Sequence, residues 1–239
     1  MKLNSKIPVI VMSLVVAMWA ESAFATSISV SFTKLTDLTG GSPTGTAVYR
    51  ADLTDLSITT IQSLTIQDNS GGLGGATGQF SGFDLDAIKL STTSISSALD
   101  ANALAGLGVF DFSPAGTLFT AGTQRPPVDP ALFGTTGADI NNAVATLGSF
   151  DANSTTAIPP AFGFVSMGDN GIASFNLTSG VSTTEGLFLY IGEVGDNGEV
   201  AAGSITVSDT PVGVPEPATL LLLGVGLVGL AAWRWKHAA

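Results

Sequence analysis

Three aspartates have the type and spacing to begin a metal site. Asp84 and Asp86 are two residues apart, so on a β-strand both side chains point to the same face. Asp68 stands just before the glycine-rich residues 71–75 and can add a third carboxylate from a loop. Calcium takes about six to eight oxygens from carboxylates and carbonyls, although this spacing does not match an EF-hand loop. The pattern allows a calcium site at Asp68, Asp84 and Asp86, but we favour the simpler interpretation that these side chains face water or bond nearby loop amides, and we expect no cofactor.

Catalytic chemistry is restricted by the residue types that the sequence lacks. The chain has no cysteine, and its one histidine is His237, near the C-terminus. Residues 26–213 therefore lack histidine-ligated zinc, Ser-His-Asp and Cys-His nucleophiles, and a histidine general base. A carboxylate pair acting on a glycoside needs neither residue type. The acids available for it are Asp84, Asp86, Glu185, Glu193 and Glu199.

The pattern of these acids does not support a glycoside-cleaving site. Nothing in the sequence places two of them across a cleft. The three tryptophans, the usual residues for stacking on sugars, are Trp19, Trp233 and Trp235, all outside residues 26–213. We therefore expect no enzyme, and a glycan-active enzyme is the least favoured alternative.

Two acidic Asn-Gly segments are either cation loops or tight turns. They are Asp169-Asn170-Gly171 and Asp196-Asn197-Gly198-Glu199. Asn-Gly accepts the positive φ angles of a type I′ turn, so tight turns are the simpler explanation of both segments. For the first segment we predict a β-hairpin that joins residues 162–167 to residues 172–177.

Short β-strands account for most of residues 26–209. Apolar and polar residues alternate from Ile28 to Phe32, which is the period of a strand with one buried face. Further strands are predicted at residues 47–53, 56–67 and 83–90. The apolar positions of the last of these slip in phase at Ala87, which indicates a β-bulge.

Residues 187–194 form a different kind of strand, because their run Leu-Phe-Leu-Tyr-Ile is apolar on both faces. Such a strand is typical of the middle of a sheet that is covered on both sides. A turn at residues 195–198 then leads to an alternating strand at residues 204–208.

Helices are expected only in the middle of the chain. Residues 96–106 have apolar side chains at helical spacing. Residues 139–147 have Asp139 as the predicted N-cap and Gly148 where a C-terminal glycine belongs. The fold class predicted from these elements is mostly β, a β-sandwich or jelly-roll with one or two short helices.

The N-terminus has the three parts of a secretory signal. Lys2 and Lys6 precede an apolar run at residues 7–20, and Ala23 and Ala25 flank Phe24 in the small-x-small pattern of signal peptidase cleavage. We predict a signal peptide at residues 1–25 and a mature chain from Thr26; an uncleaved anchor is the alternative.

The C-terminus predicts a membrane helix. Val214, Pro215 and Glu216 precede a stretch without charge that runs from Pro217 to residue 233. As a helix it would span roughly 25 Å of a hydrocarbon core of about 30 Å. Trp233 and Trp235 suit a membrane interface, and the basic residues Arg234 and Lys236 favour a cytoplasmic tail. We therefore divide the rest of the chain into a β-rich domain at 26–209, a linker at 210–213 and a sorting segment at 214–239.

This order of a Pro-Glu-Pro motif, a short apolar helix rich in Leu and Gly, and a basic end resembles the PEP-CTERM sorting signal of Gram-negative bacteria. The resemblance covers about residues 214–236 and implies an exosortase as partner, a membrane-embedded enzyme that cuts near the motif and releases or attaches the protein outside the cell. Many members have a run of arginines where this tail has Arg234 and Lys236. An ordinary C-terminal anchor is the alternative. Residues 82–88 and 190–199 also look like segments of exported β-rich PEP-CTERM proteins, without a known activity.

The charge of the predicted exported part limits its partners. Residues 26–213 hold four basic and 17 acidic residues, a net charge of −13. Such a balance disfavours nucleic acid and anionic polymers but allows divalent cations. We expect an acidic protein of the cell surface or extracellular matrix, structural or adhesive, that passes through the inner membrane with signal peptidase and an exosortase as partners. A calcium- or carbohydrate-binding module, with extracellular polysaccharide as ligand, is the alternative.

Overall fold

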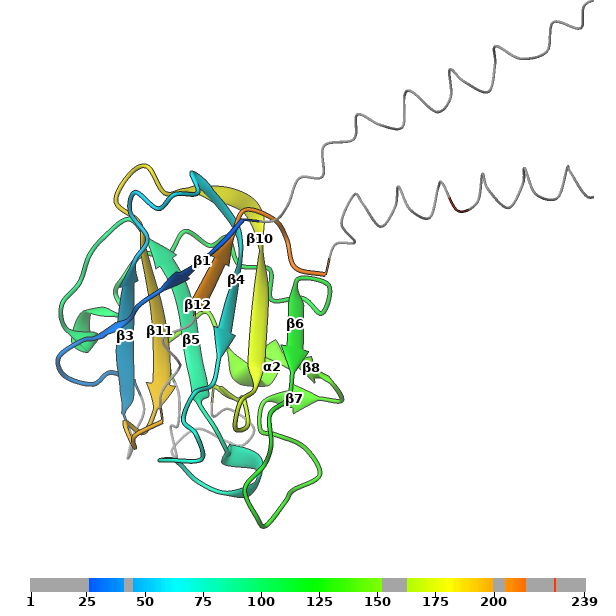
Figure 1. Cartoon of the computed structure of the whole chain (residues 1–239). Coiled ribbons are helices and arrows are strands. Elements are labelled where there is room, and N and C mark those ends of the chain that lie inside the picture. The colour runs from blue at the N-terminus through cyan, green and yellow to red at the C-terminus, as the bar shows by residue number, and fades with distance from the viewer. Residues whose placement is uncertain (1–25, 41–44, 152–162, 200–204, 214–225, 227–239) are drawn as a thin grey trace, which may run out of the picture. The chain divides into compact units, whose positions relative to one another are not determined.

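Two five-stranded antiparallel sheets pack face to face in the folded part of the chain (Figure 1). The structure is a computed structural model that describes residues 26–40, 45–151, 163–199, 205–213 and 226. The first sheet has the strand order β1 (Ser27–Val30), β12 (Ile205–Ser208), β4 (Thr60–Gln67), β10 (Ile172–Ser182) and β6 (Thr117–Thr120). The second has the order β2 (Thr33–Lys34), β3 (Thr46–Asp52), β11 (Phe188–Val194), β5 (Asp84–Ser91) and β9 (Val165–Ser166). The predicted mostly β fold is confirmed.

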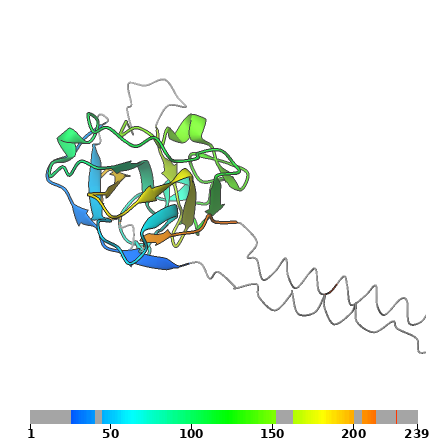
Figure 2. The ribbon, with the colours of Figure 1, turned by 90° about the horizontal axis from the view of Figure 1, so that it is seen from above.

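Short elements complete the fold between the strands. They are the hairpin of β7 (Thr135–Thr136) and β8 (Asp139–Ile140), the 3₁₀ turns η2 (Gly78–Phe80) and η3 (Ala98–Asp100), and the helix α2 (Asn142–Ala145). In the view from above, α2 lies on the other side of the molecule from the paired strands β1 and β12 (Figure 2).

The main core lies between the sheets and follows the alternation of the strands. Leu64 and Ile66 of β4 enter it, whereas Thr65 is hydrogen-bonded to Ser174 of β10 at 2.8 Å on the outer face. From the second sheet, Leu189 of β11 and its alternating neighbours are buried in the same cluster. In β4, alternation in the sequence therefore identifies the buried face correctly.

The prediction that residues 187–194 form a central strand is confirmed. β11 lies third of five in its sheet, paired with β3 on one side and β5 on the other. Its outer face is covered by a second apolar cluster, in which Tyr190 packs with Ala98, Ala101 and Phe150. The Tyr190 hydroxyl donates to the Thr93 carbonyl at 2.8 Å, which satisfies its polar end.

The predicted β-bulge in β5 is also confirmed. Ile88 pairs with Ile191 and Leu85 pairs with Glu193, so Asp86 and Ala87 together oppose Gly192 alone. One extra residue on a strand produces this arrangement and moves the following side chains to the other face. That is why the apolar positions change phase at Ala87.

The predicted hairpin around Asp169-Asn170-Gly171 is wrong. Asn170 does have a positive φ of 65°, and the Gly171 amide donates to the Gly168 carbonyl at 2.9 Å, so the tight turn exists. The strands that it joins belong to different sheets, because β9 pairs with β5 and β10 pairs with β4 and β6. The chain likewise crosses between the sheets from β11 to β12. Turn chemistry defines the bend but not the partners of the strands.

Both predicted helices are much shorter than expected. Within residues 96–106 only η3 forms, and directly after them the Leu107 amide donates to the Leu90 carbonyl of β5 at 2.8 Å. Within residues 139–147, Asp139 belongs to strand β8 and the N-cap of α2 is Asn141. The helix ends at Thr146, which has a left-handed φ of 44°, rather than at Gly148.

The two ends of the folded part meet at one place, which we call the exit end and define by Thr26, Asn176, Asp209 and Val212. Thr26 donates its amide to the Asp209 carboxylate at 2.9 Å. Asn176 of β10 accepts the Val212 amide at 2.7 Å and donates to the Val212 carbonyl at 3.3 Å. The predicted linker is thus bonded to the first sheet as far as Val212, near the upper end of β10 in Figure 1.

Several predicted features lie outside the described residues. They are the signal cleavage residues Ala23 and Ala25, the motif residues Val214, Pro215, Glu216 and Pro217, and the basic residues Arg234 and Lys236. Among the residues that the structure does describe, none forms a helix long and apolar enough to cross a membrane.

Candidate functional site

Asp68, at the end of β4, is saturated with hydrogen bonds from its own surroundings. One carboxylate oxygen accepts the Ser70 hydroxyl at 2.5 Å and the Phe83 amide at 2.9 Å. The other accepts the Asn170 amide at 2.8 Å. The side chain is fully buried, so Asp68 ties the glycine-rich loop to β5 and to the crossing at Asn170.

Asp84 and Asp86 have separate partners rather than a shared one. Asp84 accepts the Ser166 hydroxyl across the β5–β9 pair at 2.5 Å. Asp86 accepts the Thr46 hydroxyl at 2.7 Å. This bond passes over Gly192, where a β-carbon would lie 2.8 Å from the Thr46 methyl group and 3.0 Å from the Asp86 β-carbon. The glycine in β11 is therefore what lets β3 and β5 bond directly.

The structure does not bring Asp68, Asp84 and Asp86 together as one set of ligands. Each carboxylate has its own donors. Within the described ranges, no group of three or more His, Cys, Asp or Glu residues is arranged to hold a metal ion. The three-aspartate calcium site stays an untested alternative.

Glu193 is a buried carboxylate on an otherwise apolar strand face. It pairs with Ala47 on β3 and Leu85 on β5, so all three side chains point into the space between the sheets. The residue is 0% exposed, and neither carboxylate oxygen has a hydrogen-bond partner among the described residues.

The pKa of Glu193 is raised to about 8. Burial is the largest cause, and the negative charge of Glu199 is the second. The nearby Asp196 amide and Lys34 act in the opposite direction. The Asp196 amide is near enough to lower the pKa of Glu193, but it does not complete a hydrogen bond to either carboxylate oxygen. Glu193 in turn helps burial to raise the pKa of Tyr49 to about 12.

Glu199 follows the turn after β11 and packs against the glycine-rich loop. A β-carbon on Gly75 would overlap the Glu199 carboxylate, and one on Gly74 would lie 2.6 Å from the Glu199 amide nitrogen. Glu199 is 1% exposed, and both of its carboxylate oxygens lack a hydrogen-bond partner within the described segments. The loop therefore has glycines because the Glu199 side chain occupies the space beside them.

The environment of Glu199 is strongly acidic. Burial is the largest influence on its pKa, which rises to about 8. Arg125 opposes the rise, while Asp68 and Asp169 add to it. Burial and then Glu199 also raise the pKa of Asp84 well above its ordinary value.

Arg125 is the cation that contacts this group of acids. Its guanidinium donates to both carboxylate oxygens of Asp169, at 2.7 Å for the shortest bond, and to the Gly74 carbonyl. Its Nη2 atom lies 3.7 Å from Glu199, close enough for an ion pair. Arg125 thus joins three segments that are far apart in the sequence.

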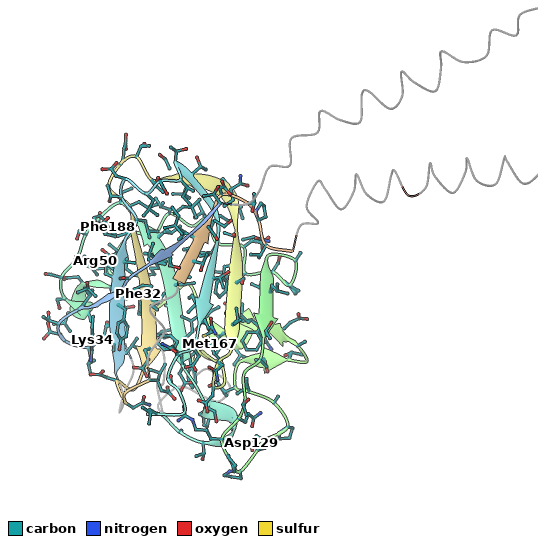
Figure 3. All side chains as sticks on the ribbon, viewed as in Figure 1. Phe32, Lys34, Arg50, Asp129, Met167 and Phe188 are labelled. Atoms are coloured by element: carbon teal, nitrogen blue, oxygen red, sulfur yellow. The ribbon has the colours of Figure 1, made fainter. Side chains whose placement is uncertain are left out.

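We call this region the carboxylate end and define it by five acids and one base. They are Asp68, Asp84, Asp169, Glu193, Glu199 and Arg125. Strand ends and loops supply all of them, and the loop that contains Asp129 lies at the same lower end of the molecule (Figure 3). Ionised carboxylates in a low-dielectric interior are costly unless they are paired, so this end carries more negative charge than Arg125 neutralises.

The sequence contains a signal for Glu193 but none for Arg125. Glu193 interrupts the apolar run of β11, and a charged residue at a core-facing position of a central strand is unusual. The role of Arg125 has no local signal, because Asp169 and Gly74 are 44 and 51 residues away from it along the chain.

A shallow groove of about 440 Å³ lies apart from the carboxylate end. Lys89, Leu107, Phe110 and Phe112 line it with their neighbours. The rings of Phe110 and Phe112 are stacked, with their centroids 5.7 Å apart, and both also pack against Phe175 in the core.

Comparison with known proteins identifies the C-terminal segment. The family model of the PEP-CTERM protein-sorting motif matches residues 213–236. No curated protein and no solved structure matches the chain significantly. The chain thus carries a PEP-CTERM sorting motif, as its Pro-Glu-Pro residues, apolar stretch and basic end predict, and the motif supports an exported protein that is targeted to an exosortase.

Proposed function

We propose that residues 26–213 form a non-catalytic, structural or adhesive module that an exosortase delivers to the cell surface or extracellular matrix. The sorting motif at residues 213–236 is the observation that carries this proposal. The acidic composition supports it, because a net charge of −13 keeps an exported domain soluble.

A non-catalytic role is also supported by the state of the acids. Histidine and cysteine are absent from residues 26–213. Asp84, Glu193 and Glu199, the acids whose pKa burial raises most clearly, are at most 6% exposed and so cannot reach a polymeric substrate. A general acid must come within hydrogen-bonding distance of the atom that it protonates.

In the proposed sorting step the protein is a substrate. Proline on each side of Glu216 favours an extended backbone and prevents the helix from continuing toward the folded domain. The motif would then be presented at the outer face of the inner membrane, while Arg234 and Lys236 keep the tail on the cytoplasmic side. Cutting near the motif would free the domain from the inner membrane.

Intact mass spectrometry tests this proposal directly. The protein is recovered from the surface or medium of a host with an exosortase, as wild type and as Glu216→Ala, with the exposed Glu185→Ala as control. We expect wild type and the control to begin at Thr26 and end near Pro217, and Glu216→Ala to keep its tail. If all three proteins retain Ala239 and stay in the membrane, the segment is an anchor and the proposal is wrong.

A carbohydrate-binding role is a second candidate, supported by the groove at Phe110 and Phe112. Stacked aromatic side chains beside a lysine can pack against a sugar face. Binding of the wild type and Phe112→Ala to extracellular polysaccharide would test it. Equal binding of the two proteins, with equal melting temperatures, would remove the groove from consideration.

A further inference from the structure

We propose that the buried carboxylates of Glu193 and Glu199, which accept no hydrogen bond within the described residues, hold a calcium-class divalent cation at the carboxylate end. This site differs from the three aspartates that the sequence suggests, because Asp68, Asp84 and Asp86 already have hydrogen-bond donors of their own. The inference goes beyond the proposed function and depends on export only for a supply of calcium.

The first argument is the number of unpaired oxygens. All four carboxylate oxygens of Glu193 and Glu199 are buried without a hydrogen-bond partner among the described residues. Buried polar atoms in folded proteins are almost always paired, and an unpaired buried carboxylate is especially costly. Two such groups in the same neighbourhood indicate a partner that is not part of the protein.

The second argument is charge. Each of Asp84 and Glu193 experiences the negative charge of Glu199, and Glu199 experiences those of Asp68 and Asp169. Arg125 is committed to Asp169 by three hydrogen bonds and only approaches Glu199 at 3.7 Å. A divalent cation beside Glu199 would neutralise the negative charge that remains after Arg125 has paired with Asp169.

The chemistry of the donors selects the kind of cation. The carboxylate end offers oxygen only, which excludes the soft-ligand sites of zinc and copper. Calcium accepts irregular sets of carboxylates, carbonyls and water, whereas magnesium demands nearly ideal octahedral geometry. Two carboxylates and no preformed group of three acids fit the weak class of extracellular calcium sites, with a Kd of about 10⁻⁴ to 10⁻³ M.

The backbone around Glu199 can supply further oxygens. Gly74 packs against the segment Asn197 to Glu199, where a β-carbon on it would lie 2.9 Å from the Asn197 carbonyl oxygen. Gly75 has no side chain, so the Glu199 carboxylate lies directly against the Gly75 backbone. A cation at this position would therefore join the glycine-rich loop to the turn after β11.

Thermal melting of the full-length protein in mild detergent tests the site. The protein is treated with EDTA and then melted with calcium, with magnesium or with neither. A ligand that binds only the folded state at 100 times its Kd raises Tm by roughly 5 to 10 °C for a domain of this size. We expect that rise with calcium and a smaller one with magnesium.

Three variants separate the site from general effects of charge. Glu193→Gln and Glu199→Gln keep the side-chain shape and should each reduce the calcium shift to less than half. Glu185→Gln removes the same charge from an exposed position and should keep the full shift. If calcium shifts none of the proteins, or shifts the Gln variants as much as the wild type, the site does not exist. A gain in Tm by both Gln variants without any calcium effect would show that the carboxyls are held as neutral acids instead.

Discussion

The exit end and the carboxylate end of the same sandwich differ in how their polar groups are hydrogen-bonded. At the exit end the Asp209 carboxylate accepts the Thr26 amide, and the Asn176 side chain bonds both polar atoms of the Val212 peptide. At the carboxylate end the carboxylates of Glu193 and Glu199 are buried and accept no hydrogen bond within the described ranges, and Glu199 has only the ion pair with Arg125 at 3.7 Å. The first end is complete as it stands, whereas the second requires a proton or a cation.

The largest effect in this comparison should come from Arg125→Gln. The substitution removes the charge that pairs with Asp169 and approaches Glu199, and it leaves buried carboxylates uncompensated. Breaking one side of a fully buried ion pair costs about 3 to 5 kcal/mol; because Arg125 and Asp169 are only partly buried, we expect the low end, about 3 kcal/mol. Urea unfolding should show this loss, while Arg50→Gln, which removes a contact over Phe188 and surface hydrogen bonds, should cost about 1 kcal/mol. Equal losses would contradict a special role for Arg125.

Gly168→Ala should have the next largest effect on stability, because Gly168 lies where the chain crosses from one sheet to the other at the carboxylate end. Gly168 has a φ of +74°, and a β-carbon there would lie 2.6 Å from the Gly122 carbonyl carbon. Left-handed strain and overpacking together predict a loss of at least about 2 kcal/mol in the free energy of unfolding. Gly137→Ala is a suitable control, since it has a similar φ of +64° and nothing within 4 Å of the added carbon. If the two substitutions cost the same, strain alone accounts for Gly168.

The pH dependence of stability tests the carboxylate end without calcium. Glu193 and Glu199 have pKa values of about 8 in the folded protein against an ordinary value of 4.5. The stability that their protons provide is thus present below pH 4.5 and is lost as the pH rises through about 8. Asp84 shifts in the same direction, and Arg125 opposes the shift of Glu199.

The measurement is urea unfolding in EDTA between pH 5 and 8.5, for wild type and for the double variant Glu193→Gln, Glu199→Gln. We expect wild type to lose stability as the pH rises and the double variant to lose much less, because its amides do not titrate. Parallel curves for the two proteins would show that these carboxyls do not titrate in this range.

The smallest effect should come from the exit end. Asn176→Ala removes two hydrogen bonds to Val212 and should cost about 1 kcal/mol. Limited proteolysis should become faster at residues 210–213, while the calcium-dependent rise in Tm stays unchanged. A change in the calcium response would mean that the two ends are coupled rather than independent.

Much of the fold could be predicted from the sequence because burial leaves a local pattern. The alternation at Ile28, the run around Tyr190 and the phase slip at Ala87 correspond to an edge strand, a central strand and a bulge. The hairpin at Asn170 could not be predicted, because a tight turn specifies a change of direction and says nothing about which sheet the next strand joins.

The candidate site was less predictable for a related reason. Asp84 and Asp86 share a strand face as their spacing indicates, but donors from Ser166 and Thr46, 82 and 40 residues away, engage them separately. The Glu199 side chain occupies the space that Gly75 leaves by having no side chain, and only the folded structure reveals this contact. Long-range partners of this kind have no signature in a single sequence.

Hydrogen–deuterium exchange with and without calcium tests the central contrast most directly. The full-length protein is compared in EDTA and in about 10 mM calcium, a concentration well above the expected Kd. We predict slower exchange at residues 70–75 and 193–199, with no change at Thr26, Asp209 and Val212. Unchanged exchange at the carboxylate end, or equal slowing at both ends, would contradict the account.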